Sequence, residues 1–125
     1  MTDSETTLEL AADPVSLRLV RLVAAALADE SGLDFEDVED VRLAVDELCA
    51  AVISATSDGG RLRVTLKHEP GAVTVDGVAP AGDRPPRLDP LSAEIVAAVT
   101  DDHSLTQVDG VCHFRFVKRH ASDQA

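Results

Sequence analysis

The sequence predicts a single α/β domain, a two-layer α+β sandwich with three helices on one face of a mixed, mostly antiparallel sheet of about five strands. The chain has 125 residues, which suits one domain, and 45% of them are hydrophobic, enough for a core. Strand and helix patterns follow the order β-α-α-β-β-α-β-β. We expect the domain to span residues 6–118, with loose polar ends at residues 1–5 and 119–125.

The first part of the chain predicts a strand followed by a helix. Apolar and polar residues alternate over residues 6–10, as in a half-buried strand. Asp13 is a suitable N-cap and Pro14 suits the first helical position, so a helix should cover residues 14–29. We assign its core face to one apolar stripe: Val15, Leu19, Leu22, Val23 and Ala26. Three residues off this stripe are either further core, which we favour, or a partner surface: Leu17, Val20 and Ala24.

A second, longer helix is predicted from the cap residue Asp34 to Ala55, after a break at Ser31-Gly32. Its apolar residues form one buried stripe: Val38, Val41, Val45, Leu48, Cys49 and Val52. Another set recurs at spacings of three and four on a different side: Asp40, Leu43, Glu47 and Ala51. A cleft, if the domain has one, should lie on that second side.

The second half of the chain predicts two hairpins separated by a loop and a helix. Residues 61–67 alternate as a strand, Glu69-Pro70-Gly71 forms the turn, and residues 72–75 begin the partner strand. Prolines and glycines mark residues 77–90 as a loop. Residues 91–100 should form a helix with four inward residues: Leu91, Ile95, Val96 and Val99. The last hairpin joins residues 104–108 to 111–117 through Asp109-Gly110.

The charge restricts the kinds of partner. A formal net charge of −12 argues against direct nucleic-acid binding and against adhesion to anionic membranes. It either steers a basic protein partner or only keeps the protein in solution. Between residues 34 and 47 there are seven acidic residues and one basic residue, Arg42. Part of this cluster is ordinary stabilisation of a helix N-terminus.

The cysteines and histidines predict no metal site. Cys49 and Cys112 lie in apolar stretches, so we expect buried free thiols without a disulfide. The four histidines show no ligand spacing with one another or with a cysteine. No signal peptide is recognisable and no apolar run is long enough to span a bilayer, so we expect a cytoplasmic protein.

The stretch from Leu43 to Ala51, Leu-Ala-Val-Asp-Glu-Leu-Cys-Ala-Ala, carries a family resemblance. It resembles the hydrophobic-Ala-Val-x-Glu-x-x-x-Asn pattern of the GHKL, or Bergerat-fold, ATPases. The element order is similar to their branch of small anti-sigma-factor serine kinases, which regulate stress and sporulation sigma factors. The resemblance places Glu47 at the catalytic base and Ala51 at the Mg²⁺-binding Asn. Residues four apart share a helix face, so both reach the same phosphates, but Ala51 has no oxygen to offer. Alternatively, Glu47 is an ordinary solvated helix carboxylate.

Two further family elements are altered. Asp76 resembles the Asp of an Asp-x-Gly-x-Gly run, which accepts a hydrogen bond from adenine, but it lies one residue early. A shift of one residue in a strand reverses the face of the side chain, and Asp76 is otherwise a turn residue. Pro90-Leu91-Ser92 stands where the family has a Gly-x-Gly phosphate loop, and Pro90 has no N–H to donate. We therefore expect the ATP site, represented by Glu47, Ala51 and Asp76, to be degenerate and binding of ATP and Mg²⁺ to be impaired.

The resemblance implies an anti-sigma-factor-like regulatory protein. Such a protein sequesters a basic, mostly helical sigma factor and is controlled by an anti-anti-sigma factor, and family members often form homodimers. We expect partner contacts at four acidic residues, with two arginines as second choices: Glu36, Asp37, Glu39, Asp40, Arg18 and Arg21. Two alternatives are an active Mg-ATP-dependent serine/threonine kinase with Glu47 as the base, and a signalling adaptor that uses no nucleotide.

Overall fold

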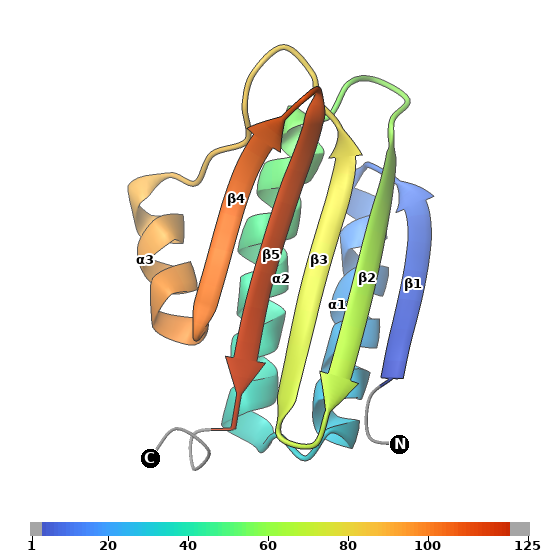
Figure 1. Ribbon diagram of the computed structural model, residues 1–125. Coiled ribbons are helices and arrows are strands. Elements are labelled where there is room, and N and C mark those ends of the chain that lie inside the picture. The colour runs from blue at the N-terminus through green and yellow to red at the C-terminus, as the bar shows by residue number, and fades with distance from the viewer. Residues whose placement is uncertain (1–3, 121–125) are drawn as a thin grey trace.

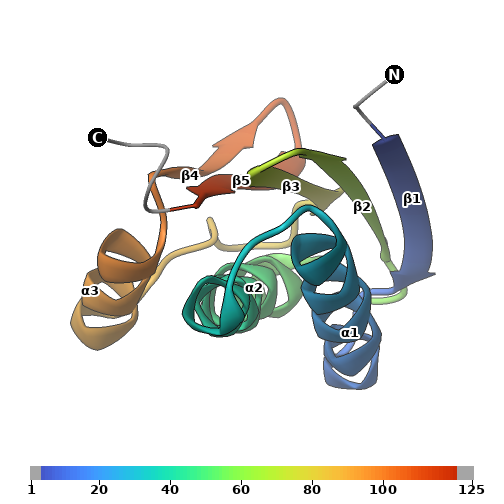
Figure 2. The same ribbon diagram turned by 90° about the horizontal axis from the view of Figure 1, so that it is seen from below.

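The computed structural model describes residues 4–120 and contains one sheet with one layer of helices. The strands are β1 (Ser4–Ala11), β2 (Arg61–Glu69), β3 (Ala72–Pro80), β4 (Asp102–Val108) and β5 (Val111–Arg119). The helices are α1 (Pro14–Glu30), α2 (Phe35–Ala55) and α3 (Pro90–Val99). All three helices lie on the same side of the sheet, as Figure 2 shows from below. The predicted two-layer fold is confirmed.

The sheet has the order β1-β2-β3-β5-β4, and each of its four strand pairings is antiparallel. The mixed pairing that we predicted is therefore wrong for the described strands. The reason is topological, because α1 and α2 form a helical hairpin that returns the chain beside β1, and two tight turns make the other hairpins. Asp109 and Gly110 both have positive φ, 51° and 78°, as expected of the predicted turn.

The core lies between the sheet and the helices. The largest fully buried side chains from the sheet are Phe114, Phe116, Leu62 and Leu66. The predicted stripe of α2 is confirmed, because Val41, Val45, Leu48, Cys49 and Val52 are fully buried, with Val38 packed partly buried against them. Cys49 and Cys112 are buried free thiols, also as predicted.

Helix α1 is rotated relative to the prediction. Its fully buried residues are Val20, Ala24 and Ala28. Three residues of the predicted stripe are instead exposed, by 80% at Val15, 48% at Leu19 and 59% at Leu22. Val23 of that stripe does pack against the core, and the favoured assignment of the off-stripe residues to further core is confirmed. Periodicity could not choose between the two faces because both are apolar. Contacts with α2 and the sheet decide the rotation, and they leave Val15, Leu19 and Leu22 exposed on the other face of α1.

The starts of the helices are confirmed, whereas several strands are longer than predicted. Asp13 caps α1, Asp34 caps α2 and Asp89 caps α3, because each aspartate side chain accepts a hydrogen bond from a backbone N–H in the first turn of its helix. β3 continues through Gly77 to Pro80, so the loop predicted over residues 77–90 covers only 81–89. β1 begins at Ser4, and the two strand residues ahead of the predicted start pair with β2 instead of forming a loose end. β5 likewise ends at Arg119.

One prediction for α3 is wrong, since Leu91 is 67% exposed while Val96 and Val99 are buried. Leu91 lies in the first turn of α3, at the rim of the helix layer. No helix in the described part of the chain is long and apolar enough to cross a lipid bilayer.

Candidate functional site

The predicted catalytic pair lies on α2, where Glu47 and Ala51 are one turn apart and both half-buried. The Glu47 carboxylate makes no hydrogen bond or ion pair with any other residue between 4 and 120, so it can accept one. Ala51 lines a pocket of about 360 Å³, formed with the end of α2 and with residues 84–87 of the loop between β3 and α3. A pocket thus remains beside Ala51, but this position supplies no oxygen to a metal.

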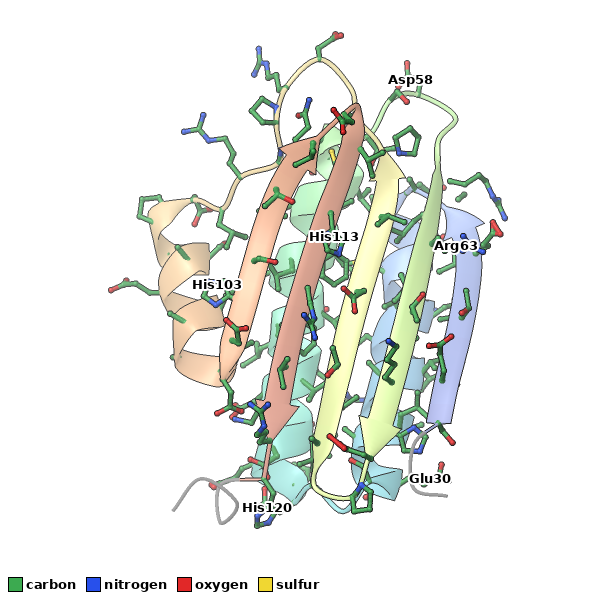
Figure 3. The ribbon with its side chains drawn as sticks, in the orientation of Figure 1. Glu30, Asp58, Arg63, His103, His113 and His120 are labelled. Carbon is green, nitrogen blue, oxygen red and sulfur yellow. The ribbon has the colours of Figure 1, made fainter. Side chains whose placement is uncertain are left out.

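Asp76 lies on the opposite side of the sheet from Glu47. Its neighbour Val75 is fully buried under the helices, and side chains alternate along a strand, so Asp76 points to the open face. There its carboxylate lies 3.0 Å from His113 Nε2 and 3.9 Å from Arg115 Nε. Figure 3 shows His113 on this open face. The structure therefore does not bring Asp76 and Glu47 together.

The inward position next to Asp76 is filled by the core. Gly77 faces the helices and pairs with Phe114 on β5. A Cβ at Gly77 would overlap the Phe114 ring, so only glycine fits this close approach. Phe114 is fully buried. On the helix side of this part of β3 there is therefore a buried phenylalanine ring, and not a polar side chain that could hydrogen-bond to adenine.

The N-terminus of α3 is occupied by its own cap. Asp89 accepts a hydrogen bond of 2.8 Å from the backbone N–H of Ser92. This hydrogen bond lowers the pKa of Asp89 below its usual 3.8, so the carboxylate is charged at neutral pH. Pro90, the first helical residue, has no N–H. An incoming phosphate would meet a negative charge and fewer donors than an open helix N-terminus offers.

The loop between β3 and α3 contributes two arginines that the sequence prediction did not single out. Arg84 lines the pocket beside Ala51 and a second, adjoining pocket of about 470 Å³ at the end of α2. Arg87 lines the first pocket, and both side chains are exposed. The available signal was two basic residues inside a proline-rich stretch of an acidic chain. The pocket beside Ala51 therefore has a basic rim, whereas the adjoining pocket is also lined by Asp58 and Asp83.

The predicted partner-contact residues lie at and near the start of α2, but several already have partners inside the protein. Asp37 is only 5% exposed, and the Lys118 ammonium lies 2.9 Å from Asp40 and 3.8 Å from Asp37. The prediction of Asp37 as a surface contact is therefore wrong, because it closes the capping box of α2 and faces Lys118. Glu36 is exposed.

The remaining predicted contact residues differ in whether their side chains already form ion pairs within the protein. Glu39 pairs with Arg42 at 3.3 Å on the same helix. Arg21 of α1 pairs with Asp46 of α2 at 2.7 Å and helps to join the two helices. Arg18 is exposed on α1. Of the two arginines, Arg18 is therefore the better placed to meet a partner.

A group of possible metal ligands occurs at the foot of α2, where atoms of Asp34, Asp37 and His120 lie within 4.8 Å of one another. His120 Nε2 is 3.9 Å from Asp34 Oδ2. The Lys118 ammonium already faces the buried Asp37 carboxylate. These contacts form an ion-pair network that ties the end of β5 to the start of α2.

The comparisons agree with this architecture. The family described as "Histidine kinase-like ATPase domain" matches residues 10–109. The anti-sigma-F factor RsbW of Mycobacterium tuberculosis, from two strains, is 33% identical over 97 residues, which cover 76% of this chain. This chain spans 57% of the length of those relatives. The crystal structure of the RsbU and RsbW domains of Rv1364c from Mycobacterium tuberculosis shares the fold, with a TM-score of 0.69 at 16% identity. That match covers 93% of this chain and 32% of the other.

The chain therefore belongs to the family of histidine kinase-like ATPase domains, within which its relatives are anti-sigma factors. The resemblance drawn from the Leu43–Ala51 segment is confirmed.

Proposed function

We propose that this protein is an anti-sigma-factor-like regulator that sequesters a sigma factor through protein contacts and has impaired ATP binding and kinase activity. An anti-anti-sigma factor would release the sigma factor by competing for the regulator. The similarity to anti-sigma-F factor RsbW supports the kind of partner. A cytoplasmic location, where a sigma factor is found, belongs to the same proposal.

The observation that carries the proposal is the separation of Glu47 from Asp76. The first lies on α2, whereas the second points to the open face of the sheet toward His113. Ala51 lacks the metal-binding oxygen, and the Asp89 carboxylate and Pro90 occupy the start of α3. Since phosphoryl transfer depends on holding phosphates and metal in place, these residues do not fit the family's way of holding Mg-ATP.

The alternative, an active kinase, has one observation in its favour. Glu47 is unpaired, and the pocket beside Ala51 carries the exposed Arg84 and Arg87, whose guanidinium groups suit phosphate oxygens. Magnesium, however, would need an oxygen ligand in place of the missing amide. A thermal-melt titration with Mg-ATP separates the two functions. A kinase whose site is saturated at about 100 times its Kd gains roughly 2.7 kcal/mol of stability, and we expect no such gain.

Sigma-factor binding requires its own measurement. Each sigma factor of the organism that encodes the chain is immobilised, and the association of the purified protein is followed at low and high salt. We expect one sigma factor to bind without nucleotide, with faster association at low salt because the protein is acidic. If none binds and Mg-ATP produces no stabilisation, the adaptor function replaces the anti-sigma function.

A further inference from the structure

We propose that an exposed apolar stripe on α1 is the docking surface for a basic amphipathic helix of a partner protein. The α1 stripe consists of Val15, Leu19, Leu22 and Ala26. Its assignment to a sigma factor rests on the proposed function, whereas the surface and its chemistry rest on the fold alone.

The α1 stripe is a continuous surface feature. Spacings of four, three and four residues place its members on one face of the helix, over about 16 Å. Val15 is 80% exposed, Leu22 59% and Leu19 48%. Isolated exposed apolar residues are ordinary, but a row of this kind marks an interaction site in a soluble domain. The opposite face of α1 already supplies the core contacts, so folding does not require the stripe.

The charges around the α1 stripe select a basic partner. Residues 13–55, which include both long helices, carry ten acidic and three basic side chains. Two of these bases pair within the region, Arg21 with Asp46 and Arg42 with Glu39, and the third, Arg18, is exposed beside the stripe. Two of the acids, Asp37 and Asp40, are paired with Lys118 of β5, so the partner's basic groups are expected at the Asp29 and Glu30 end of the stripe. Asp29 and Glu30 are exposed at the end of α1, next to the stripe, and Figure 3 shows Glu30 at the foot of the molecule. Their carboxylates form no ion pair with the residues that the structure describes.

A second copy of the chain fits this surface less well. It would bring two chains of net charge −12 together through their acidic helix layers, and repulsion of like charges opposes that contact. A helix with leucine-like residues along one side and lysines or arginines beside them would cover the apolar row and meet the carboxylates. The two helices would then contact each other through residues at spacings of three and four.

A peptide experiment tests the surface without any sigma factor. The probe is an amphipathic peptide of about 14 residues with leucines along one side and lysines elsewhere, and the control carries glutamates in place of the lysines. In amide NMR spectra of the full chain, we expect the lysine peptide to shift the signals of Leu19, Leu22 and their neighbours. The glutamate peptide should not. Shifts confined to other surfaces, or equal shifts with both peptides, overturn the proposal.

Variants then connect the α1 stripe to the partner. Leu19→Glu is expected to lower the affinity of the protein for the lysine peptide, and for any sigma factor that it binds, by about tenfold or more. Leu91→Glu, on the exposed first turn of α3, is the matched control and should leave binding unchanged. Normal melting of both variants confirms folding, and Leu22→Ser repeats the test with a smaller change.

The outcomes separate this inference from the proposed function. If a sigma factor binds the Leu19→Glu variant as tightly as the original protein, the α1 stripe is not its docking surface, but the proposed anti-sigma function still holds. If the lysine peptide shifts the amide signals of the α1 stripe but no sigma factor binds, the docking surface is supported and the anti-sigma function is contradicted. A dimer in sedimentation equilibrium that Leu19→Glu converts to monomer overturns the choice of occupant, because the surface is then covered by a second copy.

Discussion

At the scale of single residues, Lys118 is the side chain that most directly links the two layers. It projects from β5, is 12% exposed, and lies between the carboxylates of Asp37 and Asp40 on α2. Because Asp37 is buried, its charge depends on this neighbour for compensation. The contacts of Lys118 with Asp37 and Asp40 therefore stabilise the fold, although the sequence suggested that these two acidic residues contact a partner.

Replacing this lysine tests its structural role. Lys118→Met keeps most of the apolar stem but removes the ammonium, which leaves the buried Asp37 carboxylate and the half-buried Asp40 carboxylate without this cation. We expect the free energy of unfolding in urea to fall by about 2–3 kcal/mol. Lys67→Met is the control, because its ion pair with Glu5 is long, 3.8 Å, and mostly exposed. That change should cost less than about 0.5 kcal/mol, and equal losses in the two variants would contradict the argument.

The contacts of single residues also explain why the sequence identified Asp76 as a candidate but did not place it in the middle of a strand. Its neighbour Gly77 suggested the start of a loop, whereas the glycine is required because Phe114 packs against it across the sheet. A contact between residues so distant in the sequence leaves no local pattern. The alternative that Asp76 is a turn residue is wrong, because β3 continues to Pro80 and the carboxylate lies on the open face of the sheet.

At the scale of elements, the caps were the most predictable features. Asp13-Pro14 and Asp34 indicated the starts of α1 and α2, and the structure shows the capping hydrogen bonds. A side-chain oxygen that accepts a bond from an N–H two or three residues later depends only on nearby sequence. The rotation of α1 was not predictable in this way, since it depends on where α2 and the sheet lie.

The cap of α3 makes a prediction about pH. The hydrogen bond from Ser92 lowers the pKa of Asp89 in the folded protein below the usual 3.8. A carboxyl group with a lowered pKa stabilises the fold above its unfolded pKa, and this contribution is lost as the pH falls through the folded value. We therefore expect Asp89→Ala to lower the melting temperature at pH 7, and the difference to shrink below about pH 4.

A matched variant checks this mechanism. Asn is as good an N-cap as Asp but does not titrate, so Asp89→Asn should keep the melting temperature near the original at pH 7. Below pH 4, it should melt at or above the original protein. A constant difference between Asp89→Ala and the original protein from pH 7 to pH 3 would show that the carboxylate charge is not involved.

At the scale of the whole molecule, charge and apolar surface are unevenly distributed. Residues 13–55, which form the two long helices and their caps, carry ten of the chain's 23 acidic residues but only three of its eleven basic residues, and they also carry the α1 stripe. The sheet's open face instead carries the basic residues Arg63 and Arg115 together with His113. A basic partner approaching such a molecule is steered toward its helices.

The closed core gives a prediction for the thiols. Burial, with a smaller effect from Asp46, raises the pKa of Cys49 to about 12, and burial also raises that of Cys112. Only the thiolate is reactive, so a disulfide reagent at pH 8 should modify neither cysteine in the native protein within minutes. Both should react at once in strong denaturant. A fast native phase for one thiol would show that its part of the core opens locally.

By itself, the sequence was sufficient to determine the order of the elements, the helix starts, the tight turn at Asp109-Gly110 and the family, because each depends on neighbouring residues or short spacings. Only the tertiary structure decided which apolar face of α1 is buried, that Asp37 and Asp40 face Lys118, and that Gly77 accommodates Phe114. Each of these depends on segments that meet only after the sheet and helices have packed, and packing selects among faces that local periodicity leaves equivalent.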